Sequence, residues 1–243
     1  RIRPRYDDGG AGAWSGASAF HIGDKQFSEQ DAVIYNSDLI QDGLVAFGSF
    51  APEFASAVID KFGNEIWNSK EPGISDFMLN YISEYGNIYG QSFYDYPYNT
   101  GTKVNYNLDF LWSTQGDLNS DGEIQEQFEG VNLDAIDIHE IKQIPNGNYM
   151  AFVPDYRLGP IPDGSWSFLF QMSGYQADGV TEEFPWIGIR LVEWDQEGNE
   201  IWNWDPFEHF TMDDTDLYGG TWWGSFDTGA HDWMHSNAFH FDE

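Results

Sequence analysis

The chain contains no cysteine among its 243 residues, which excludes disulfides, thiolate metal sites and thiol nucleophiles. It also lacks any run of about eighteen apolar residues, the length that a membrane-spanning helix needs. The first residue is Arg1 rather than Met, and no short apolar stretch follows a basic leader. We therefore expect a soluble chain without membrane insertion, which is processed or partial.

Basic residues are scarce, with 10 Lys+Arg against 41 Asp+Glu and a formal net charge of -31. Such a charge excludes a binder of nucleic acid or of anionic membranes. The chain is 41% hydrophobic and 18% aromatic, too much for a disordered acidic tail. Excess carboxylates keep a protein dispersed in high salt, so a saline extracellular setting is one explanation and an ordinary acidic secreted protein is the other. Both predict secretion, either extracellular or periplasmic.

Residues 1–30 differ from the rest and are interpreted as an extended Gly/Ala/Ser-rich arm. Residues 31–243 consist of short β-favouring runs, such as Tyr149–Val153 and Ile187–Trp194, separated by Gly, Asn, Asp and Pro turns. Helical periodicity is rare, and the best helical candidate is Pro72–Tyr85. The expected fold class is all-β.

One internal repeat is visible, because the segment Ile59–Asn68 returns as Glu193–Asn203. Each copy is a strand, an Asp-x-x-Gly-Asn hairpin turn and a second strand. The shared Gly-Asn-Glu-Ile-Trp begins at 63 and 198, an offset of 135 residues, or three periods of about 45, the length of a four-stranded propeller blade. The hairpin over residues 138–153 lies between the copies and fits another blade. The pattern therefore predicts a β-propeller of four-stranded antiparallel blades.

Three segments within residues 57–240 resemble the arylsulfotransferase family, in the family's order. Asp137–Asn148 resembles its His-Asp/Glu-Ile segment followed by Leu-Pro-Asn-Gly-Asn, and Glu193–His209 resembles its blade hairpin. His231–Ala238, read as His-Asp-Trp-Met-His-Ser-Asn-Ala, is similar to its Asp-Trp-x-His-x-Asn-Ser signature. The resemblance implies a six-bladed propeller and transfer of a sulfuryl group from an aryl sulfate to a phenol through a histidine, without a nucleotide donor.

By the same resemblance, His139 and His235 match histidines of the central channel that bind or polarise the sulfuryl oxygens, and Asn237 matches a residue that orients the group. The family also has an arginine beyond the third segment and the sulfurylated histidine on a later blade. Neither position is matched here, so the nucleophile is expected outside this chain. At about 45 residues per blade, residues 31–243 correspond to four or five blades.

Two functional hypotheses follow from these observations. The first is an arylsulfotransferase-like enzyme acting on an aryl sulfate and a phenol. The second is a non-catalytic extracellular propeller that serves as an assembly or glycan-binding module. In either case another chain, or a second copy of this one, is expected to complete the propeller, since an open propeller leaves exposed sheet edges.

A candidate calcium loop lies within an insertion at residues 115–130. Its spacing, Asp-x-Asn-x-Asp-Gly-x-Ile, provides side-chain oxygens at the first, third and fifth positions and a backbone carbonyl at the seventh. The twelfth position is Phe128, so Glu126 or Glu129 would have to supply the bidentate ligand. The alternative is a solvated turn. The candidate ligands are Asp117, Asn119, Asp121, Glu123 and Glu129.

Two further patterns have a structural and a functional interpretation. His231 and His235, with His240 beyond them, suggest either zinc ligands or hydrogen-bonded histidines of the channel or core, and the sequence favours the latter. The many aromatic residues suggest blade core or sugar-stacking platforms, for which Trp222-Trp223, flanked by glycines, is the best exposed candidate.

Overall fold

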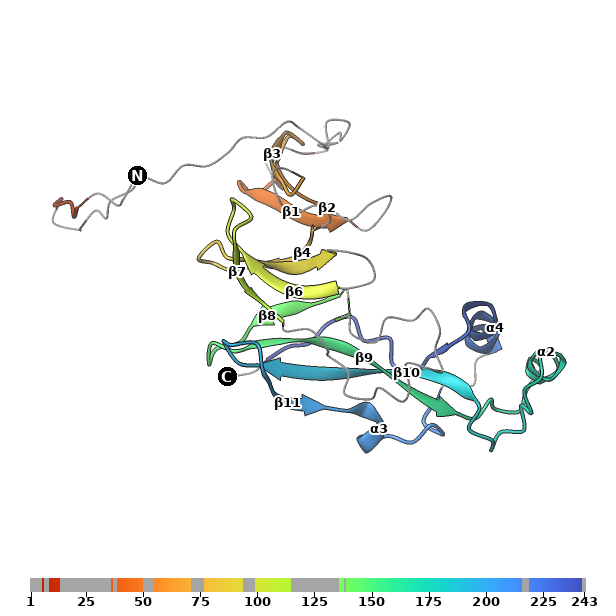
Figure 1. The fold of residues 1–243 in the computed structure, drawn as a ribbon. Coiled ribbons are helices and arrows are strands. Elements are labelled where there is room, and N and C mark those ends of the chain that lie inside the picture. Colours follow the sequence, from red (N-terminus) through yellow and green to blue (C-terminus); the bar gives the residue numbers. More distant parts are fainter. Residues whose placement is uncertain are drawn as a thin grey trace.

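The structure is a computed structural model of the chain. It describes residues 6, 9–13, 36, 39–49, 55–70, 77–93, 99–114, 136–137, 139–215 and 219–241. Of these residues 42% lie in strands and 12% in helices, which confirms the prediction of a β-rich chain. The strands form three antiparallel sheets, which follow one another in chain order (Figure 1).

Each sheet is a meander in which strands that follow in sequence pair side by side. The first sheet contains β1 (Leu44–Ser49), β2 (Ala55–Asp60) and β3 (Glu65–Asn68). The middle sheet contains β4 (Phe77–Ile82), β5 (Ile88–Phe93), β6 (Asn99–Val104) and β7 (Phe110–Ser113). The third contains β8 (Ile141–Gln143), β9 (Tyr149–Gly159), β10 (Phe184–Trp194) and β11 (Glu200–Trp204), with β12 (His231–Asp232) pairing in parallel with β10.

Five hairpins among the described residues close with the same turn. In each, the residue at the start of the turn accepts the N–H of the third residue after it, and that third residue has a positive φ. This is a type I turn followed by a left-handed residue, which favours glycine. The left-handed residues are Gly63, Gly86, Leu108, Gly147 and Gly198. The hairpins predicted at Ile59–Asn68, 138–153 and Glu193–Asn203 are thus confirmed.

The blade count predicted from the repeat differs from the structure. The hairpin over residues 138–153 belongs to the same sheet as the second repeat copy, so within the described residues the offset of 135 spans two sheets rather than three. The long segment between β9 and β10, residues 160–183 with α2 (Ser167–Met172) within it, stretches the spacing. The described residues hold three sheets, against the four or five predicted, and none of them closes on itself. The helix predicted at Pro72–Tyr85 is also wrong, since Phe77–Ile82 is strand β4.

The sheets pack through contacts that begin at their first strands, because β1 contacts β4, and β4 contacts β8. At the first of these contacts, a Cβ on Gly48 would lie 2.5 Å from the carbonyl oxygen of Leu79, so only glycine fits there without a shift. Between the middle and third sheets lies a core of Tyr89, Trp112, Ile136, Ile141, Tyr149, Ala151, Val153, Val192 and Trp194.

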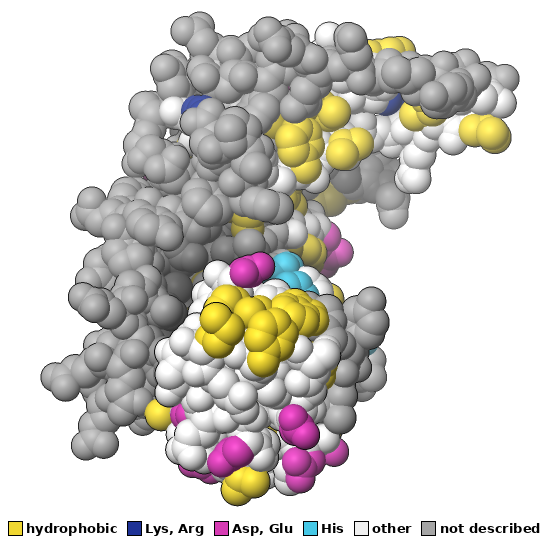
Figure 2. Space-filling view, turned by 90° about the vertical axis from the view of Figure 1, so that its right-hand side faces the viewer, with side chains coloured by type: hydrophobic (Ala, Val, Ile, Leu, Met, Phe, Trp, Pro, Cys, Tyr) yellow, Lys and Arg dark blue, Asp and Glu magenta, His cyan; other side chains and the backbone are white. Residues whose placement is uncertain are grey.

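A separate aromatic core lies at the far end of β9 and β10. It is covered by α2 (Ser167–Met172) and α4 (Gly219–Thr228), while α3 (Pro206–His209) follows β11. Trp222 is fully buried in this core, so the predicted Trp222-Trp223 platform is wrong for its first member. Trp223 is 38% exposed and meets Phe168 with 6.1 Å between ring centroids. The end of the molecule with α2 and α4 faces the viewer in Figure 2, where hydrophobic side chains gather on the surface. No helix in the described residues is long and apolar enough to cross a membrane.

Candidate functional site

His139 precedes β8 and is held by the carboxylate of Asp137. The Asp137 Oδ1 atom accepts the His139 backbone N–H at 2.9 Å and lies 2.5 Å from its Nδ1 atom. Asp137 is itself fixed, because its N–H donates to the carbonyl of Phe152 on β9 at 2.8 Å. The fully buried side chain of Gln91 donates to the Asp137 carbonyl. The ring of His139 is therefore oriented from a backbone anchored in two sheets.

His235 follows β12 and has the same kind of partner. The carboxylate of Asp232 accepts the His235 backbone N–H at 3.2 Å and bonds to its Nδ1 atom. This hydrogen bond and the Asp232 charge raise the pKa of His235 above its ordinary value, with a further contribution from the charge of Asp137. His235 has a left-handed backbone, with φ of 34°. The imidazolium form of this ring is thus stabilised by its surroundings.

The two histidines meet, although 96 positions separate them in the sequence. Their ring centroids lie 5.8 Å apart in an edge-to-face arrangement. An ionised carboxylate only accepts hydrogen bonds, so each Nδ1 atom carries a proton and each Nε2 atom is left for other partners. Among the described residues, neither Nε2 atom has a hydrogen-bond partner. The site therefore presents two oriented imidazoles with open Nε2 atoms.

Tyr156 and Asn237 lie next to this pair. Burial raises the pKa of Tyr156 to about 12, with smaller contributions from the charges of Asp232 and Asp137. Tyr156 pairs with Ile187 across β9 and β10, and Ile187 pairs with Asp232 of β12, which explains its place. Asn237 is exposed, and its Nδ2 atom donates to the carbonyl oxygen of His235 at 3.0 Å.

Sequence reasoning named the two histidines but missed Asp137, Asp232 and Tyr156 as parts of the site. A signal for the carboxylates was present, since an aspartate precedes each histidine by two or three residues. Tyr156 gave no comparable signal, because its position depends on strand register. Histidines in the notch between the third sheet and the sheets above it are visible in Figure 2, with acidic side chains beside them.

The cations of this half of the chain are all engaged with carboxylates. The only Lys and Arg after position 104 are Lys142, Arg157 and Arg190. Lys142 pairs with Glu140 at 2.7 Å, and Arg190 pairs with Glu200 at 3.3 Å. Arg157 binds Asp155 and Asp205, and its guanidinium lies 4.6 Å from the ring centroid of Phe207. Within the described residues, histidine is thus the source of positive charge at the site.

His231 has a different environment from His235 and does not pair with it. It is 2% exposed and stacks on Trp222, with 4.0 Å between ring centroids. The Ser225 hydroxyl donates to the Thr221 carbonyl at 2.9 Å, so it accepts the proton of His231 Nδ1, also at 2.9 Å. The Thr215 hydroxyl lies 3.2 Å from Nε2. His231 is therefore a neutral, hydrogen-bonded core residue, the alternative that the sequence favoured over zinc.

The predicted metal ligands have a different status. Asp117, Asn119, Asp121, Glu123 and Glu129 lie outside the described residues. In the part of the chain that the structure describes, no three His, Asp or Glu side chains converge into a metal-binding group.

Comparisons with known proteins do not assign a family. Neither a scan against protein-family models nor a search of curated proteins gives a match to this chain. The arylsulfotransferase resemblance therefore depends on the motifs quoted above.

The burial of His231 leads to a prediction about how stability depends on pH. Burial lowers its pKa from 6.5 to about 4, so the unfolded chain takes up a proton at pH values where the folded chain does not. The contribution of His231 to the free energy of unfolding should be fully present above about pH 6.5. It should fall as the pH drops toward 4, by up to about 3 kcal/mol. Denaturant unfolding of the parent and of His231→Phe between pH 7 and pH 4 measures this contribution.

The difference between the two proteins isolates His231 from the carboxylates that titrate in the same range. His209→Phe is the matched control, because His209 is exposed and stacks on Trp204 with 5.2 Å between ring centroids. A parent and a His231→Phe variant with the same pH slope would contradict the assignment of His231 as a neutral core residue.

Proposed function

We propose that this chain is part of a secreted, arylsulfotransferase-like β-propeller that moves a sulfuryl group from an aryl sulfate to a phenol through a histidine, without a nucleotide cofactor. The observation that carries the proposal is the meeting of His139 and His235, each with Nδ1 on a carboxylate and Nε2 open. These are the two histidines that the family resemblance assigns to the central channel.

The arrangement of the sheets supports the propeller in this proposal. Three successive meanders share one hairpin turn, and neighbouring sheets contact each other through their first strands, β1, β4 and β8. In a propeller the first strand of each blade lines the channel. His139 immediately precedes the first strand of the third sheet. A further chain or a second copy would complete the ring, beside the first sheet or beyond the third.

The chemistry requires a site that stabilises negative charge on oxygen. As the S–O bond to the donor phenol breaks, an N–S bond forms to the nucleophilic histidine, which the resemblance places outside this chain, and the donor leaves as a phenolate. The acceptor phenol then attacks sulfur, loses its proton and regenerates the histidine. Overall, aryl sulfate and phenol exchange one sulfuryl group.

The residues of this chain have separate roles in that scheme. As an imidazolium, His235 donates its Nε2 proton to a sulfuryl or phenolate oxygen, and its raised pKa keeps that form populated nearer neutral pH. Neutral His139 has its proton on Nδ1, toward Asp137, and presents a lone pair on Nε2 that accepts the phenol proton. Asn237 has a second amide hydrogen for a neutral donation. One local cation, His235, is thereby offered to an anionic substrate in a chain of net charge -31.

The first test is binding of phenyl sulfate, followed by NMR of the histidine ring protons. We expect the signals of His139 and His235 to shift together and His235→Gln to weaken binding, because the variant loses the cationic donor. His209→Gln, which removes an exposed histidine outside the site, should bind like the parent. Phenyl sulfate that shifts neither ring signal would contradict the site.

Transfer is tested with 4-nitrophenyl sulfate and a phenol acceptor, on the native preparation together with every chain that copurifies. His139→Gln and His235→Gln should each lower the rate of 4-nitrophenolate release by about 100-fold, because the first removes the proton acceptor and the second removes a preorganised donor at a developing oxyanion. Native material that releases no 4-nitrophenolate, or variants as active as the parent, would overturn the proposed reaction.

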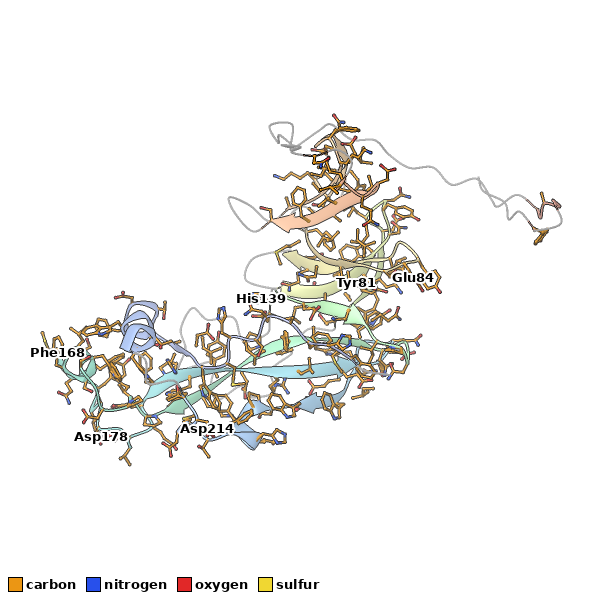
Figure 3. The ribbon with its side chains drawn as sticks, turned by 180° about the vertical axis from the view of Figure 1, so that it is seen from behind. Tyr81, Glu84, His139, Phe168, Asp178 and Asp214 are labelled. Atoms are coloured by element: carbon orange, nitrogen blue, oxygen red, sulfur yellow. The ribbon has the colours of Figure 1, made fainter. Side chains whose placement is uncertain are left out.

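One observation favours the second candidate function, an extracellular glycan-binding module. A hollow of about 690 Å³ at the β4–β5 turn is lined by Tyr81, Tyr85 and Tyr89 together with Glu84 and Gln143. Tyr81 and Glu84 lie toward the turn end of the middle sheet, away from His139 (Figure 3). Tyr85 is 82% exposed, and the rings of Tyr81 and Tyr89 stack with centroids 5.7 Å apart.

Tyr89 is 1% exposed, so the flat apolar face of this stacked pair is offered by Tyr81, which is 42% exposed. Such a face suits the apolar side of a pyranose ring, and the side chains of Glu84 and Gln143 suit its hydroxyl groups. The Tyr89 hydroxyl donates to Gln143 Oε1 at 3.0 Å, which fixes that amide. The carboxylate of Glu84 and the charge of the chain favour a neutral sugar over an acidic one.

Calorimetric titration with neutral gluco-, manno- and chito-oligosaccharides tests this groove. Tyr81→Ala and Tyr85→Ala should each weaken binding of the best ligand by about tenfold, a loss of about 1.4 kcal/mol. Trp202→Ala, at an aromatic residue that is 46% exposed on β11, is the control that should bind normally. Binding that the tyrosine variants leave unchanged would contradict the proposed groove.

Calcium at residues 117–129 also stays a proposal. A cation that binds only the folded chain must raise its stability, so the melting temperature should rise with Ca²⁺ and fall on chelation. Asp117→Asn combined with Asp121→Asn should abolish this dependence, while Asp213→Asn combined with Asp214→Asn should keep it. A melting temperature that chelation leaves unchanged would reduce the loop to a solvated turn.

A further inference from the structure

The segment after β12 returns across the molecule to the strand that follows His139 (Figure 1). There, both backbone polar groups of Phe239 are bound by side chains. Its N–H donates to Glu140 Oε2 at 2.7 Å, and its carbonyl accepts from Lys142 Nζ at 2.8 Å. Glu140 directly follows His139, and Lys142 lies within β8. The start of β8, next to His139, therefore binds the segment that carries His235.

Further contacts around Phe239 strengthen this attachment. Lys142 and Glu140 form an ion pair of 2.7 Å, with side chains 24% and 20% exposed. The Lys142 ammonium lies 4.5 Å from the centroid of the Phe239 ring, and Phe152 meets that ring edge-to-face at 5.4 Å. Hydrogen bonds with a charged donor or acceptor are stronger than neutral ones, and partial burial limits their screening by salt. The set of contacts is thus an anchor rather than a loose surface ion pair.

His235 itself has no comparable anchor. Its side chain is 64% exposed, and its hydrogen bonds within the described residues come from Asp232 and Asn237, which belong to the same segment. Local bonds of this kind orient the ring relative to its own backbone but do not place the segment against β8. Pairing of β12 with β10 fixes the segment at Asp232, and the Phe239 contacts fix it at the other end.

We propose that Glu140 and Lys142 are positioning residues, which hold Phe239 so that His235 lies against His139. The acidic residue of the His-Glu-Ile motif then binds backbone instead of substrate. This inference concerns the site on which the proposed sulfuryl transfer depends, but it is tested by the geometry of the two rings and not by turnover.

The test is the double variant Glu140→Ala with Lys142→Met, which removes the acceptor and the donor. In the parent, ring protons of His139 and His235 should give an NOE, and the double variant should lose it. The pKa of His235 should also shift down toward its ordinary value, because Asp137, the charged neighbour from outside its own segment, no longer faces it. Asp232, on the same segment, should keep the rest of the shift.

Two controls separate positioning from general unfolding. The NOE between His231 and Trp222 reports on the aromatic core and should persist in the double variant. Lys61→Met breaks a more exposed ion pair, with Asp42, beside the first sheet and should keep the inter-histidine NOE. Glu140→Gln retains an acceptor oxygen and should keep part of the NOE intensity.

A folded double variant with an unchanged NOE and an unchanged His235 pKa would overturn the inference. If the double variant does not fold, Lys142→Met alone provides the same test, because the methionine stem still packs on Phe239. Loss of the NOE in a protein that never transfers sulfuryl groups would uphold the positioning role and remove only the proposed reaction.

Discussion

The long antiparallel pairing of β9 with β10 is the interaction on which the rest of the described structure depends. The two strands pair without interruption from Phe184 with Gly159 to Trp194 with Tyr149. One end of this ladder lies in the core shared with the middle sheet, and the other lies in the aromatic core beneath α2 and α4. Both histidine segments are attached to it, Asp137 through the Phe152 carbonyl of β9 and Asp232 through pairing with Ile187 of β10. The meeting of His139 with His235 therefore follows from strand register.

Register also explains what sequence patterns predicted and what they missed. The Asp-x-x-Gly-Asn turns were predictable because a left-handed residue is a local requirement, which glycine reveals. Leu108 adopts the same conformation without being glycine, and its turn gave no signal; its side chain is 5% exposed, so burial offsets the cost. The count of sheets was not predictable from spacing, since β9 and β10 have 11 residues each and α2 lies between them, so the third sheet takes up more of the chain than a regular repeat predicts.

Burial and strand pairing, which local sequence does not reveal, explain the two other predictions that were wrong. The best helical candidate, Pro72–Tyr85, contains Phe77–Ile82, which is a strand that pairs with β5 and packs against β1 of the first sheet. Trp222 was placed on a surface because glycines surround it, although it is fully buried beside His231. Tertiary contacts overrode the local composition in both cases. The resemblance singled out His139 and His235, but their carboxylate partners, Tyr156 and the contact between the two rings required the fold.

His231 and His235 show how much of the chemistry depends on surroundings rather than on residue type. They are four positions apart, and their pKa values shift in opposite directions. His231 loses hydration in an aromatic core and bonds to hydroxyl groups, which do not compensate a cation, so it stays neutral. His235 keeps its contact with water and gains a carboxylate, so its cation is favoured. The left-handed backbone at His235 turns the chain between these environments. One short segment thereby supplies a neutral histidine that packs in the aromatic core and a histidine that faces His139 and whose cation is favoured. The nearby lysine and arginines of this acidic chain are already paired with carboxylates. His235 is therefore the residue that can bring positive charge to the site.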